Sequence, residues 1–195
     1  MRFYDREKET AELLRIRQLT MTDSSRMTLV TGRRRIGKTT LIQRAYADAA
    51  MVYLYVKRRN EKELVQSFCE AIRSQIDLFI PNGIAQFRDL LRLLLEYSKQ
   101  HPFTLVLDEF QEFVHVNTDI FQDMQELWDT YHTQTHLNLI SRGYLPARKK
   151  TPRKSNDLQG ERCNNLFINT LLHKLVQNLG KWSIFLFFFR FLLNS

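Results

Sequence analysis

A glycine-containing segment of this sequence has the residue types that bind phosphate groups. Residues 32–39, GRRRIGKT, match the pattern GxxxxGK[ST], known as Walker A. Glycines let successive backbone N–H groups point inward around an anion, and a helix N-terminus adds partial positive charge. Lys38 can reach β and γ phosphates, the Thr39 hydroxyl can bind Mg²⁺, and Thr40 is placed to contact an α phosphate. The expected phosphate-binding residues are Gly32, Arg33, Arg34, Arg35, Ile36, Gly37, Lys38, Thr39 and Thr40.

An acidic pair provides the second candidate feature. Asp108 and Glu109 directly follow the apolar segment FTLVL, which predicts a buried strand. In open α/β sheets ligands bind at the carboxyl ends of strands. We expect Asp108 to hold Mg²⁺ through water and Glu109 to orient and deprotonate an attacking water, a pair that favours hydrolysis over nucleotide binding alone. The alternative for Glu109 is a supporting role beside Asp108.

The surrounding elements are those needed to position both motifs. Segments that are apolar throughout predict strands, and three- and four-residue spacings of apolar residues predict helices. Asn60 followed by Glu63 is typical of a helix N-cap. Strands are expected at 27–31, 51–56, 103–107 and from 137, and helices at 6–19, 41–50, 84–98, 120–131 and after Asn60.

This alternation predicts an α/β fold in which helices cover both faces of a parallel sheet. With the Walker motifs, it indicates a three-layer P-loop NTPase sandwich. The strand at 51–56 falls between Walker A and the acidic pair, Walker B. It therefore favours the class of P-loop ATPases that has an additional strand between the two motifs.

Composition restricts the class of protein further. The 195 residues are 44% apolar and 26% charged, which is typical of one globular domain and excludes collagen-like and disulfide-scaffold proteins. Cys69 and Cys163 have no metal-ligand spacing and are interpreted as reduced thiols. The charged N-terminus lacks the apolar run of a signal peptide, and the apolar run at 182–193 is too short to span a membrane. We expect a cytoplasmic protein without membrane contact.

The chain changes character after residue 140. Residues 1–140 contain 19 basic and 19 acidic side chains, whereas residues 141–195 contain 10 basic and 2 acidic ones. We therefore divide the chain into an incomplete ATPase domain, 1–140, and a basic, Phe-rich tail, 141–195, in which 166–179 has the pattern of a helix. A reading-frame change or truncation near codon 140 is our hypothesis for this abrupt loss of pattern.

Several motifs together resemble a known family. FYDRE at 3–7, VTGRRRIGKTTLI at 30–42, LVLDEFQEF at 105–113 and the stretch at 116–129 are similar to the archaeal-type ATPases of the STAND-like branch. The likeness covers about residues 1–140. It implies an ATP-driven regulatory switch with ATP and Mg as cofactors, with the box at 3–7 near the adenine, and a winged helix following the domain. The family's sensor and arginine finger have no assignable counterpart here.

Two other functions fit the same sequence. The basic loops and tail could engage nucleic acid while nucleotide merely gates that surface. The chain could instead be an inactive, truncated ATPase fragment. The expected partners are a nucleotide, with a protein partner or self-association and nucleic acid as open alternatives.

Overall fold

The computed structural model describes residues 6–32, 35–143 and 167–171. A five-stranded sheet has the order β2-β3-β4-β1-β5. Four strands run parallel: β1 (Arg26–Thr31), β2 (Met51–Tyr55), β3 (Phe103–Asp108) and β4 (Leu137–Arg142). The fifth, β5 (Phe167–Leu171), pairs antiparallel with β1. The predicted parallel sheet is thus confirmed for the four strands that precede residue 143.

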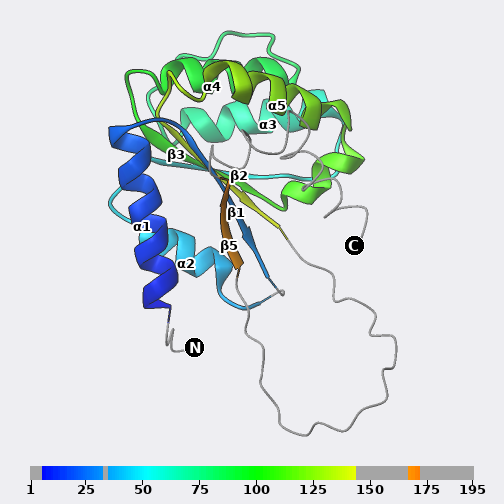
Figure 1. Cartoon of the computed structure of the whole chain (residues 1–195). Helices are drawn as coiled ribbons and strands as arrows, with labels where there is room; N and C mark the ends of the chain where they lie inside the picture. The colour runs from blue at the N-terminus through cyan, green and yellow to red at the C-terminus, as the bar shows by residue number, and fades with distance from the viewer. Residues whose placement is uncertain (1–5, 33–34, 144–166, 172–195) are drawn as a thin grey trace, which may run out of the picture.

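Helices cover both faces of this sheet (Figure 1). On one face lie α3 (Glu61–Arg73), α4 (Phe87–Tyr97) and α5 (Asp119–Tyr131). The other face carries α1 (Glu7–Thr22) and α2 (Lys38–Ala45). The 3-10 helix η1 (Phe110–His115) follows β3. The arrangement is the expected three-layer α/β sandwich.

Alternating side chains of the central strands supply two apolar cores. Leu105 and Leu107 of β3 pack into the larger core, with the apolar faces of α3, α4 and α5. Val106 points the other way and joins Leu41 and Ile42 of α2. Because both faces of β3 are covered, all of its residues are buried. A strand of this kind can deliver a polar residue at its end to a fixed position.

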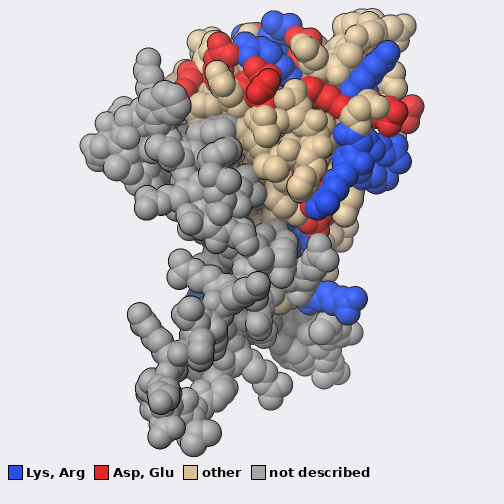
Figure 2. Space-filling view, turned by 90° about the vertical axis from the view of Figure 1, so that its right-hand side faces the viewer, with Lys and Arg blue, Asp and Glu red and all other residues tan. Residues whose placement is uncertain are grey.

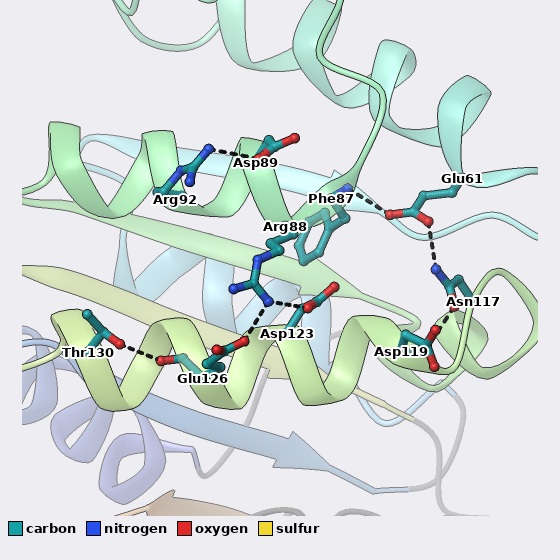
Figure 3. Close-up of polar contacts among 10 residues, drawn as sticks. All are labelled: Glu61, Phe87, Arg88, Asp89, Arg92, Asn117, Asp119, Asp123, Glu126 and Thr130. Atoms are coloured by element: carbon teal, nitrogen blue, oxygen red, sulfur yellow. Dashed lines mark hydrogen bonds and ion pairs between the residues drawn. The ribbon is translucent and has the colours of Figure 1, made fainter.

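Polar contacts tie α3, α4 and α5 together (Figure 3). A Glu61 carboxylate oxygen accepts a 2.8 Å hydrogen bond from the backbone N–H of Phe87, which begins α4. Its other oxygen accepts one of 2.8 Å from the side-chain amide of Asn117. Glu61 therefore holds the start of α4 and the turn after η1 in one place. Arg88 pairs with Asp123 and Glu126 across the same layer.

Several expectations differ in detail from the structure; the helix expected at 41–50, for example, spans Lys38–Ala45. The helix expected at 84–98 begins only at Phe87, where Glu61 satisfies its first N–H group. Strand β2 is only half-buried, because Val52 and Leu54 face the larger core whereas alternate residues point to the other, less covered face of this edge strand. The helix expected at 166–179 is wrong for residues 167–171, which form β5 and satisfy the free edge of β1; residues 172–179 lie outside the described part.

Two further expectations, that no segment spans a membrane and that the cysteines are reduced thiols, can be compared with the described residues. In the described ranges, none of the helices has both the length and the apolar composition needed to cross a bilayer. The apolar run at 182–193 lies outside those ranges, as does Cys163. Cys69 is a buried free thiol, and burial raises the pKa of that thiol.

Candidate functional site

Both glycines of the segment between β1 and α2 have positive φ angles. Gly32 follows β1 with φ of 152°, and Gly37 precedes α2 with φ of 86°, both in the region that favours glycine. Arg35, exposed between them, has a left-handed φ of 63°. Arg33 and Arg34 lie outside the described residues. The glycines on either side of this gap therefore adopt backbone conformations that other residues rarely take.

Lys38 closes this turn from the inside. Its side chain is 4% exposed, and its Nζ donates a 2.7 Å hydrogen bond to the carbonyl oxygen of Gly32. This hydrogen bond holds the ammonium group next to Gly32, the first residue of the loop. A phosphate oxygen in the loop would offer the Lys38 ammonium a charged acceptor in place of the neutral Gly32 carbonyl. A hydrogen bond between two charged groups is the stronger of the two.

The N-terminus of α2 is held rigidly against the sheet. Leu41, Ile42 and Ala45 are buried in the core on this face, and the Leu41 N–H bonds the Gly37 carbonyl at 2.9 Å. The first N–H groups of a helix have no partner within the helix and can bind an anion. Thr39 is half-buried and Thr40 exposed in this first turn.

Asp108 ends β3 in a buried position and is 4% exposed. Its Oδ1 accepts a 2.7 Å hydrogen bond from the backbone N–H of Glu109. Its Oδ2 accepts hydrogen bonds from the hydroxyl of Tyr53 and from Nη1 of Arg142. Both carboxylate oxygens are thus already engaged by donors from three neighbouring segments.

Glu109 follows with a left-handed backbone, φ 53° and ψ 41°. A non-glycine residue in this region is uncommon, costs of order 1–3 kcal/mol, and persists only where interactions with its surroundings offset that cost. The side-chain amide of Gln111 donates to Oε2 of Glu109. Phe110 and Phe113 anchor the following η1 in the core. Glu109 is half-buried at the carboxyl edge of the sheet.

Strand β4 brings the two motifs to one edge. In the parallel ladders Arg142 is in register with Val30 of β1 on one side and with Asp108 of β3 on the other. The Gly143 N–H continues the pairing with a 3.2 Å bond to the Val30 carbonyl. In sequence β2 lies between the Walker motifs, but in space β4 separates the two strands that carry them.

Sequence reasoning missed two residues of this site. Tyr53 was interpreted only as part of an apolar strand, and Arg142 as the start of the tail. Burial, followed by its hydrogen bond to Asp108, raises the pKa of Tyr53 to about 12, so it is a hydroxyl donor at neutral pH. Strand order was the missing information, because it places β2 and β4 on either side of Asp108.

The side chains at this edge fit a Mg²⁺ ion in their chemistry. Mg²⁺ takes oxygen ligands and is commonly held by one or two carboxylates together with substrate phosphates and waters. Asp108 supplies a carboxylate and Thr39 a hydroxyl. Within the described residues there is no group of three or more acidic, His or Cys side chains that could hold a metal by itself. A site of this composition therefore depends on the phosphates for its remaining ligands.

Charges on the described surface are mixed. Figure 2 shows basic and acidic side chains next to one another on the face it views. Several of the described basic residues form ion pairs, such as Arg58 with Glu112 and Lys99 with Glu96. This mixture follows the equal numbers of basic and acidic residues in 1–140.

Sheet order, glycine loop and acidic strand end together define a P-loop NTPase fold. A family model described as "AAA domain" matches residues 21–148, and the chain belongs to that family. No curated protein matches the chain.

Two solved structures share the fold. The Walker-type ATPase PABY2304 of Pyrococcus abyssi aligns with a TM-score of 0.53 and 17% identity, over 72% of this chain and 45% of that protein. Cdc6p of Pyrobaculum aerophilum aligns with a TM-score of 0.51 and 19% identity, over 73% of this chain and 40% of that protein. The chain therefore spans less than half the length of either protein.

Proposed function

We propose that this chain binds ATP together with Mg²⁺ at the carboxyl edge of β1, β3 and β4, and that binding rather than rapid turnover is its main activity. The observation that carries the proposal is the β1–Gly32–Gly37–α2 turn with Lys38 buried inside it, at the same sheet edge as Asp108. Membership of the AAA domain family supports the same conclusion.

Each residue has a role that follows from its position. The loop from Gly32 and the first N–H groups of α2 bind the phosphates, and Lys38 neutralises their charge. Thr39 and Asp108, the latter through water, hold Mg²⁺, which when bound neutralises charge developing on the phosphate oxygens. Thr40 lies one residue further along the helix, near an α phosphate.

Glu109 is proposed to orient and deprotonate a water for hydrolysis. Phosphoryl transfer also gains much of its rate from a positive finger and from closure of a lid. Among the residues that the structure describes, Arg142 is the arginine that contacts Asp108, and it is engaged with that carboxylate instead. We therefore expect this chain alone to hydrolyse ATP slowly.

The domain boundary belongs to the proposal. An ATPase part at 1–140 and a tail at 141–195 remain the division we propose, in cytoplasmic surroundings. The last two residues of β4 fall beyond residue 140 and belong to the sheet, so a fragment made for experiments should extend at least to Gly143.

Thermal unfolding of the full chain with and without Mg-ATP tests the proposal. Ligand at about 100 times its dissociation constant stabilises a protein by about 2.7 kcal/mol. For a domain of this size each kcal/mol raises the midpoint by roughly 2–4 °C, so a shift of about 5–10 °C is expected. Lys38→Ala should abolish the shift.

Lys62→Ala is the matched control, because Lys62 is an exposed lysine in the first turn of α3, on the opposite face of the sheet. This variant should keep the full shift. An unchanged midpoint in the wild type, or an equal shift in Lys38→Ala, would overturn the proposed nucleotide site.

A further inference from the structure

Arg142 occupies a central position that neither motif accounts for. It lies at the end of β4, in register with Asp108 on β3 and with Val30 on β1. Its side chain is 17% exposed and that of Asp108 is 5% exposed, so water screens the pair only weakly. Nη1 of Arg142 donates both to Asp108 Oδ2 and, at 3.2 Å, to the Tyr53 hydroxyl.

Tyr53 completes the arrangement from the other neighbouring strand. Its hydroxyl donates to the same Oδ2 atom that accepts from Arg142. The three side chains come from β2, β3 and β4 and form a closed cluster in which each contacts the other two. The Asp108 carboxylate is therefore paired with a cation that the protein itself supplies.

The pair is not fully satisfied. Nε of Arg142 is buried and has no hydrogen-bond partner in the described structure. A buried donor without a partner costs about 1–3 kcal/mol, which reduces the net stability of holding the guanidinium in this place. The ion pair can therefore be displaced, but only by a competitor that gains more from Asp108.

We propose that Arg142 acts as a resident cation that competes with the divalent ion for Asp108, so that Mg²⁺ adds little to the affinity of this chain for ATP. The inference rests on the proposed nucleotide site and adds a property to it. Two cations cannot share one carboxylate oxygen closely without repulsion, and a guanidinium is always charged. A Mg²⁺ ion bound with the phosphates would therefore gain from the Asp108 carboxylate, directly or through water, only when Arg142 moves away from it.

The experiment is a titration of the full chain with ATP by calorimetry, once in EDTA and once in excess Mg²⁺. In the wild type the two dissociation constants should differ by less than about threefold. Arg142→Gln frees Asp108, and Mg²⁺ should then tighten binding by about tenfold or more, which corresponds to 1.4 kcal/mol. Electron paramagnetic resonance of Mn²⁺ in the presence of ATP measures ion binding directly. The affinity for Mn²⁺ should likewise be about tenfold higher in Arg142→Gln than in the wild type.

Three further variants separate this role from a structural one. Arg142→Lys keeps the charge and should keep the weak Mg²⁺ dependence. Adding Asp108→Asn to Arg142→Gln should remove the tenfold gain, because the freed carboxylate is its source. Arg88→Gln breaks an ion pair with Asp123 and Glu126 in the α4–α5 layer and should leave both constants unchanged. Thermal unfolding checks that each variant is folded.

Two outcomes would overturn the inference in distinguishable ways. If the wild type binds ATP at least tenfold more tightly with Mg²⁺, or if a folded Arg142→Gln variant does not increase this ratio, the competition is refuted while the nucleotide site stands. If the wild type binds no ATP in either condition, the nucleotide site is refuted and the inference falls with it. If Arg142→Gln is unfolded, Arg142→Lys decides, since a large Mg²⁺ dependence in that variant contradicts a role for the charge.

Discussion

Gln111 donates a hydrogen bond from its side-chain amide to Oε2 of Glu109, two residues earlier in the chain. Glu109 has a left-handed backbone at the point where β3 ends and the chain turns into η1. The buried rings of Phe110 and Phe113 hold that turn against the core. The carboxylate of Glu109 is thus held beside Asp108 by its neighbours, which the proposed role in positioning water requires.

Glu109→Gln should separate binding from hydrolysis. The amide keeps the size of the side chain but cannot accept a proton, so ATP affinity should stay within about threefold and the single-turnover rate should fall by about 100-fold. Single-turnover hydrolysis of labelled ATP, with affinity measured by calorimetry, checks both numbers.

Glu112→Gln is the control for this prediction. Glu112 lies three residues after Glu109 in η1 and pairs with the exposed Arg58. Loss of this carboxylate should change the hydrolysis rate by less than about twofold. Glu112 has no proposed part in hydrolysis, and ion pairs with an exposed partner contribute little to stability. An undiminished rate in Glu109→Gln would assign Glu109 the supporting role.

Local sequence patterns predicted the helices, strands and helix cap that depend on residues close together in the chain. Asn60 was expected to cap a helix, and its side chain accepts a 2.9 Å bond from the Glu63 N–H. The glycine loop and Asp108 were placed between the right elements because strand and helix patterns flank them. The chemical roles of those residues stay predictions.

Contacts between strands that are far apart in the chain could not be predicted from the sequence. Tyr53 and Arg142 meet Asp108 only because β2 and β4 lie on either side of β3, and no residue spacing encodes that order. Likewise, residues 167–171 have the apolar spacing of a helix, yet main-chain pairing with the edge of β1 makes them a strand. Tertiary pairing overrides a local period in a short segment.

Asn60→Ala should destabilise the protein by about 1 kcal/mol through loss of the α3 cap. The Glu63 N–H would lose its side-chain acceptor. Urea unfolding of the two proteins measures the difference. Asn82→Ala, at an exposed position in the loop before α4, should change stability by less than about 0.5 kcal/mol. Equal effects of the two substitutions would show that the cap contributes nothing.

Glu61→Ala should cost about 1–3 kcal/mol, because it removes the acceptor of both the Phe87 N–H and the Asn117 amide (Figure 3). Loss of these bonds loosens the start of α4 and the turn after η1. Urea unfolding gives the free energy, and hydrogen exchange at Phe87 should quicken. Glu63→Ala removes an exposed carboxylate from the same helical turn and should cost less, about 0.3–1 kcal/mol. A matching loss in both variants would contradict the bridging role.

Tyr46 should make the stability of the protein depend on pH at alkaline values. Its hydroxyl donates a 3.0 Å hydrogen bond to the Leu13 carbonyl and accepts one of 3.1 Å from the Asn138 amide. Burial raises the pKa of this hydroxyl from its ordinary value of 10 to about 12. Because the folded protein disfavours the phenolate, stability is fully present below pH 10 and is lost as pH rises from about 10 to 12.

The difference between wild type and Tyr46→Phe isolates this contribution. At pH 8 the variant should be less stable by about 1–3 kcal/mol, because the Leu13 carbonyl loses its donor. Between about pH 10 and 12 the wild type should lose up to about 2–3 kcal/mol more than the variant, which has no hydroxyl to ionise. Urea unfolding at a series of pH values measures both free energies, and curves that fall in parallel would show that Tyr46 ionises as readily in the folded protein as in the unfolded chain.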